Sequence, residues 1–70
     1  GTHAASGDIV ITRRNDRRLR AGRSWVRNGD RWKVADVRSD GSMLVRREGR
    51  SRGSAVLLPA AYVAEHVELG

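Results

Sequence analysis

Residues 31–48 read RWKVADVRSDGSMLVRRE, and this pattern is that of two β-strands joined by a tight turn. In the first strand, 31–38, apolar and polar residues alternate as in a half-buried strand. The alternation shifts by one residue at Ala35-Asp36. The residues between the strands include Asp40 and Gly41, which shape a short hairpin turn. The second strand covers 43–48. The stretch therefore predicts a β-hairpin, and its tryptophan, Trp32, is predicted to lie in the core.

Further strands are predicted on both sides of this hairpin, at 8–12, 54–58 and 64–69. Pro59 ends the fourth strand because it has no amide donor, and a short 3₁₀ turn is expected near Pro59–Tyr62. Asn28 and Gly29 form a turn at the end of one long connection, 13–30, which could fold back as an irregular hairpin. The order of these elements predicts an all-β fold, a small five-stranded SH3-like barrel.

The chain of 70 residues provides one core, expected to be a barrel over 7–70 cut from a larger protein. Residues 1–6 are expected to be a disordered tail or a remnant of cloning. No cysteine, transmembrane run or signal peptide is present, which favours a cytoplasmic location. No catalytic motif or metal-binding spacing occurs, so the sequence predicts neither an enzyme nor a metal site, and no cofactor for this chain.

The charge of +6 is unevenly distributed. Residues 13–33 hold nine cations and two carboxylates, and a second basic segment covers 46–52. All but one of the 14 cations are arginine, which recognises phosphate in a planar, bidentate way. Both basic segments are predicted to form loops of one barrel, which indicates contact with a nucleic-acid backbone. The candidate nucleic-acid-binding residues are Arg13, Arg14, Asn15, Arg17, Arg18, Arg20, Arg23, Trp25, Lys33, Arg46, Arg47, Arg50 and Arg52.

Several of these residues also have a simpler explanation. Asn15 and Asp16 can form an Asx turn that redirects the chain and fans out the arginines around it. Trp25, in the basic connection, can either stack on a base or pack against the fold. Tyr62 is expected to anchor the core or a turn through its hydroxyl, and His66 is expected in an edge strand.

Four stretches together resemble one known subdomain: GDIVITRRNDR at 7–17, NGD at 28–30, LPAAYV at 58–63 and HVELG at 66–70. It is the SH3-like insertion (subdomain 2B) of RecD/TraI-type superfamily 1 helicases, as carried by MobF-type (TrwC/TraI-like) conjugative relaxase-helicases of actinobacteria. The positions that carry the pattern are Asn15, Asp16, Asn28 and Gly29. The present basic connection is longer than in the simplest members.

This resemblance implies a barrel inserted in the second RecA-like motor lobe, where it lies against single-stranded DNA while the motor uses ATP and Mg. The expected partners are single-stranded DNA and the motor lobes of the parent chain. The expected function is therefore that of a non-catalytic accessory subdomain, monomeric when isolated and without contact to a membrane. Two alternatives remain: an RNA-binding SH3-like module and a purely structural docking subdomain. A peptide-binding SH3 domain is disfavoured because the chain has three aromatic residues and a basic long connection.

Overall fold

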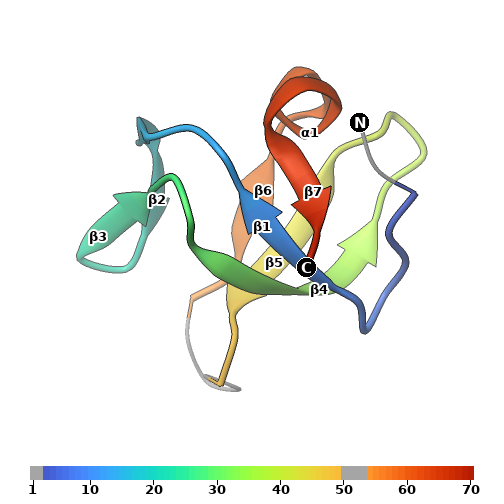
Figure 1. The fold of residues 1–70 in the computed structure, drawn as a ribbon, viewed down its shortest axis with the longest axis horizontal. Helices are drawn as coiled ribbons and strands as arrows, with labels where there is room; N and C mark the ends of the chain where they lie inside the picture. Colours follow the sequence, from blue (N-terminus) through green and yellow to red (C-terminus); the bar gives the residue numbers. More distant parts are fainter. Residues whose placement is uncertain (1–2, 50–53) are drawn as a thin grey trace.

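Five antiparallel strands form the main sheet of the computed structural model, which describes residues 3–49 and 54–70. In chain order the elements are β1 (Ile9–Thr12), β2 (Asp16–Ala21), β3 (Ser24–Val26), β4 (Arg31–Val37), β5 (Met43–Arg47), β6 (Val56–Leu58), α1 (Ala60–His66) and β7 (Val67–Leu69). The strands of the main sheet lie in the order β6-β5-β4-β1-β7, and a separate pair, β2 and β3, lies to one side of the sheet (Figure 1). The predicted all-β fold with its central hairpin is confirmed.

The core is formed by alternate residues of these strands. Val10, Trp32, Val34 and Val45 are fully or almost fully buried on the inner face of the sheet. A register shift between Val34 and Asp36 interrupts the pairing of β4 with β5 at the position where the apolar pattern of the sequence slips. The ring nitrogen of Trp32 donates a hydrogen bond to the buried hydroxyl of Thr12 over 3.1 Å. The one polar group of the largest core side chain therefore has a hydrogen-bond partner.

The connection at 13–30 is a hairpin, one of the two forms that the sequence left open. β2 and β3 pair with each other, and β2 contacts β6, so the hairpin packs against the barrel. Val26 is fully buried and anchors the end of the hairpin in the core. Gly29 then has φ of +92° in the turn that leads into β4, a conformation that only glycine adopts without strain.

The prediction of a strand at 64–69 is wrong for residues 64–66. Residues Ala60–His66 form an α-helix, longer than the expected 3₁₀ turn, and β7 covers only Val67–Leu69. Three alanines, which have the highest helix propensity, lie in this segment, while Tyr62 and Val63 bury one face of the helix. His66 is consequently the last residue of a helix and does not lie in an edge strand.

The segment expected to lie outside the fold is partly packed. Ala4 is only 8% exposed and belongs to the core, and the Ala5 amide donates to the Asp8 carboxylate over 2.9 Å. The Gly7 amide donates to the carbonyl of Val34 over 2.8 Å, which joins this segment to β4. The packed part of the chain therefore begins before residue 7, because Ala4 belongs to the cluster of buried core residues.

Candidate nucleic-acid interface

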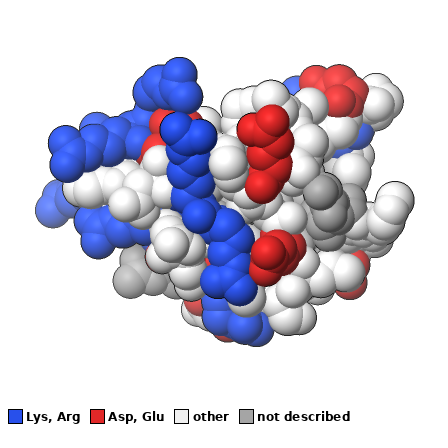
Figure 2. Space-filling model, turned by 45° about the horizontal axis from the view of Figure 1, so that its top comes forward, with Lys and Arg blue, Asp and Glu red and all other residues white. Residues whose placement is uncertain are grey.

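The β2–β3 hairpin carries exposed cations that have no carboxylate partner. Arg17, Arg20 and Arg23 are all exposed, and no ion pair within residues 3–49 and 54–70 involves any of them. Figure 2 shows Lys and Arg side chains gathered on the side of the molecule where the hairpin lies and continuing as a stripe across the face. Most of the carboxylates visible in that view lie beyond the stripe. The hairpin is therefore a positively charged surface open to solvent.

Trp25 lies within this surface as a half-buried ring. The guanidinium carbon of Arg17 lies 5.2 Å from the ring centroid, and that of Arg27 lies 4.3 Å from it. Both contacts are cation–π interactions, which orient the guanidinium planes while leaving their charge exposed. Arg27 is absent from the predicted interface. Its position two residues after Trp25 could have identified it, because alternation along an extended chain brings both side chains to one side.

Asn15 and Asp16 form the base of the hairpin. The side-chain carbonyl of Asn15 accepts a hydrogen bond from the Asn28 amide over 2.8 Å, which joins the two ends of the connection. Asp16 accepts from the Arg18 amide over 3.0 Å, which is an Asx turn, and from the Arg18 guanidinium. The Arg18 guanidinium and amide hold the pKa of Asp16 below its ordinary value, and the same pair raises the pKa of Arg18. Asn15 and Asp16 thus shape the chain.

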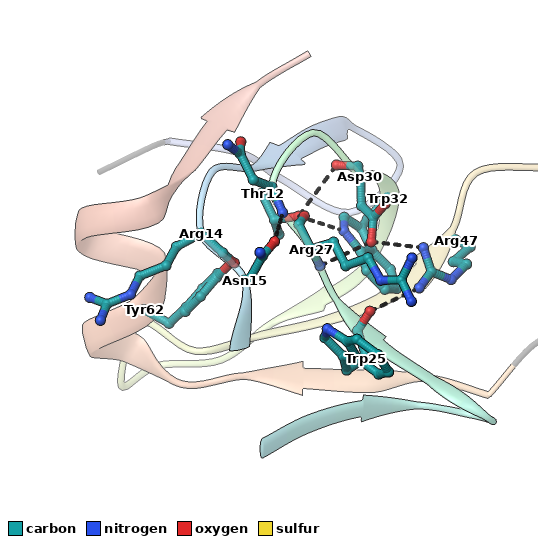
Figure 3. A network of polar contacts seen from close by, with 10 residues as sticks. Thr12, Arg14, Asn15, Trp25, Arg27, Asp30, Trp32, Arg47 and Tyr62 are labelled. Atoms are coloured by element: carbon teal, nitrogen blue, oxygen red, sulfur yellow. Dashed lines mark hydrogen bonds and ion pairs between the residues drawn. The ribbon is translucent and has the colours of Figure 1, made fainter. Parts of the chain in front are cut away.

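Arg47 is directed into the protein. One guanidinium nitrogen lies 2.9 Å from the Asp30 carboxylate, and another donates to the carbonyl of Trp25 over 3.1 Å (Figure 3). The guanidinium also lies 4.6 Å from the ring centroid of Trp32. These groups come from β5, from the end of the hairpin and from β4. Arg47 therefore connects the hairpin to the barrel.

The remaining predicted residues lie in different surroundings. Arg13 pairs with Glu68 over 3.0 Å, whereas Arg14 is exposed. Lys33 and Arg46 are opposite each other on β4 and β5, outside the hairpin, and have no carboxylate partner in the described parts of the chain. Arg50 and Arg52 fall outside the described residues. Of the predicted residues, the structure thus places Arg17, Arg18, Arg20, Arg23 and Trp25 together on one hairpin.

A groove of about 510 Å³ lies between the start of the hairpin and α1. One wall is formed by Arg14, Asp16, Arg18 and Leu19. The other is formed by Pro59, Ala61, Tyr62, Glu65 and His66. The Tyr62 hydroxyl donates to the carbonyl of Arg14, and burial raises the pKa of this phenol (Figure 3). The sequence indicated the tyrosine anchor but not the groove, because the groove depends on the full length of α1.

Between residues 3 and 49 and between 54 and 70, no three His, Asp or Glu side chains gather as metal ligands would. Among the same residues, the helix is too short and too polar to cross a membrane.

A comparison with protein families matches residues 1–68 to one family, described as the Rv2311 SH3-like barrel domain. This match covers nearly the whole chain and agrees with the small all-β architecture. No curated protein and no solved structure gives a significant match.

Proposed function

We propose that this chain, which belongs to the Rv2311 SH3-like barrel domain family, is a non-catalytic module that contacts the backbone of single-stranded DNA. The observation that carries the proposal is a group of exposed arginines on one hairpin, Arg17, Arg20 and Arg23, which form no ion pair among the described residues. Cations that repel one another on a small surface are stabilised when phosphates replace their counterions, and the released counterions favour binding.

The surroundings of Trp25 favour a single strand over a duplex. An aromatic ring on a basic surface can stack on an unpaired base, and guanidinium planes held by such a ring present their edges to phosphates. Arg17 and Arg27 both lie over this ring. The hairpin thus offers stacking and phosphate contact within one element, which is the combination found in proteins that bind single strands without sequence preference.

The resemblance to the inserted barrel of RecD/TraI-type helicases and conjugative relaxases supports a particular context for this module. In that context the barrel is an accessory subdomain of a cytoplasmic, ATP-dependent DNA helicase. ATP and Mg belong to the motor lobes of the parent chain, and the barrel lies beside those lobes. Its role is to hold the strand while the motor opens and closes.

Titration of labelled oligo-dT at several salt concentrations tests the proposal. Contacts to four to six phosphates give a log–log salt slope of roughly −3 to −4 for a single strand. The triple variant Arg17→Gln, Arg20→Gln, Arg23→Gln should weaken binding and make this slope shallower by about 2, because three phosphate contacts are lost.

The matched control is Lys33→Gln, Arg38→Gln, Arg46→Gln, which removes the same charge from exposed or half-exposed sites outside the hairpin. We expect its salt slope to stay close to that of the wild type. If both triple variants change the salt slope equally, the hairpin contributes no more to DNA binding than the rest of the surface does. Binding of the wild type that does not depend on salt would contradict the proposal itself.

A further inference from the structure

The groove beside α1 is not used by the hairpin contacts proposed above. Its walls are the start of β2 and the exposed side of α1, so it adjoins the basic hairpin through the shared strand. At about 510 Å³ it falls in the range of small-molecule sites. The lining residues Leu19, Pro59 and Ala61 contribute apolar surface, which a flat, weakly polar group could cover.

Three polar side chains of the groove lining are neighbours: Arg14, His66 and Glu65. A guanidinium nitrogen of Arg14 lies 3.4 Å from the Nε2 atom of His66, and that atom lies 3.6 Å from the carboxylate of Glu65. The Glu65 side chain is 73% exposed, so its oxygens remain accessible to a ligand. The groove lining therefore offers hydrogen-bond donors on Arg14 and acceptors on Glu65.

We propose that the groove binds one base of the single strand and prefers a base that carries an amino group beside a ring-nitrogen acceptor, as cytosine and adenine do. This inference rests on the proposed function. Glu65 accepts a hydrogen bond from the amino group, as carboxylates do from cytosine, while Arg14 donates to an acceptor on the same edge of the base. Leu19, Pro59 and Ala61 cover the face of the ring.

Thymine is the disfavoured base for an electrostatic reason. Its ring N–H lies between two carbonyl oxygens, which the carboxylate of Glu65 repels. The other carboxylate of the groove, Asp16, does not alter this preference, because it is only 15% exposed and both of its oxygens accept hydrogen bonds from Arg18. Selectivity is therefore assigned to Glu65.

The test compares labelled oligo-dC with oligo-dT of equal length at one salt concentration and one neutral pH. We expect oligo-dC to bind about fivefold more tightly, near the lower limit for a side-chain contact with one base edge. Glu65→Ala should bring the ratio of the two affinities close to one. The control Glu48→Ala, which removes an equal charge outside the groove, should leave the ratio unchanged.

A second measurement locates the site. Addition of dCMP should shift the amide resonances of Ala61 and Glu65 more than dTMP does. Equal affinities for oligo-dC and oligo-dT, together with steep salt dependence, would overturn the base site and leave the proposed function intact. Loss of the preference in both glutamate variants would also overturn it, since it would indicate a general charge effect. Salt-independent binding of both oligonucleotides would contradict the proposed function instead.

Discussion

The guanidinium of Arg47 holds together three parts of the chain: the carboxylate of Asp30, the carbonyl of Trp25 and the ring of Trp32. Its side chain is 26% exposed and that of Asp30 is 22% exposed, so both charges are partly desolvated. A pair of this kind costs free energy when one partner is lost, because the other charge stays behind without compensation. Arg47 thus stabilises the position of the hairpin on the barrel.

The variant Arg47→Met separates this supporting role from phosphate contact. We expect the free energy of unfolding to fall by about 1–3 kcal/mol, because Asp30 and the Trp25 carbonyl lose a charged donor. Any oligo-dT binding that remains should have an unchanged salt slope. A direct phosphate contact would instead make the slope shallower by about 0.7. Urea unfolding and the DNA titration measure the two quantities.

The neighbouring Arg46 provides the matched control. It lies directly opposite Lys33 across β4 and β5, and like charges in that position destabilise a sheet. Arg46→Met should therefore leave the free energy of unfolding unchanged or raise it slightly. A loss of stability as large as that of Arg47→Met would show that the anchoring contacts are not the cause.

Among the elements, the turn between β4 and β5 was predicted most fully. Asp40 accepts hydrogen bonds from the Ser42 hydroxyl over 2.6 Å and from the Ser42 amide over 2.9 Å, and Gly41 takes the positive φ that follows. These contacts are local, so the sequence of a few adjacent residues is enough to predict them. The helix α1 was predicted less well, because its length depends on burial of Tyr62 and Val63 against distant strands.

The same turn leads to a pH prediction. The Ser42 hydroxyl and amide hold the pKa of Asp40 below its ordinary value in the folded protein. The stabilisation is therefore complete above the pKa of the unfolded state and is lost as the pH falls through the lower folded value. Asp40→Asn should lose less of its stability than the wild type between about pH 5 and pH 2. Thermal unfolding at the two ends of this range measures the difference.

Asp36→Asn is the control for this experiment, since no hydrogen bond from the described residues reaches its side chain. Its loss of stability in acid should match that of the wild type. If both variants lose less stability in acid than the wild type does, and by the same amount, the effect comes from net charge and not from the turn contacts.

At the scale of the whole molecule, Lys and Arg side chains gather on the side where the hairpin lies (Figure 2). The exposed arginines there repel one another, and added salt screens this repulsion. Salt should thus have opposite effects on folding and on binding: it raises the melting temperature and lowers the affinity for DNA.

The melting temperature measured from about 50 to about 200 mM salt tests this statement. We expect it to rise for the wild type and to rise less for the variant Arg17→Gln, Arg20→Gln, Arg23→Gln. A melting temperature that falls with added salt would contradict the repulsion, since it would show that attractive ion pairs dominate the charge interactions of the fold.

Local patterns in the chain were sufficient for the all-β class, the central hairpin, its turn and the burial of Trp32. Each of these depends on alternation or on turn chemistry over a few neighbouring residues. They were also sufficient to indicate a basic connection, because charge is a property of composition. The resemblance to a known helicase subdomain contributed the context that is now proposed.

Which arginines remain free was decided only by the folded chain. Arg13 meets Glu68, which is 55 positions away, and Arg47 meets Asp30 and Trp25. These partners come from other strands, and no local pattern predicts such encounters. The groove has the same origin, because its two walls belong to β2 and α1 and meet only when the barrel closes. Side-chain contacts between segments distant in sequence depend on the packing of the whole core, and this packing separates the exposed arginines from those that hold the fold together.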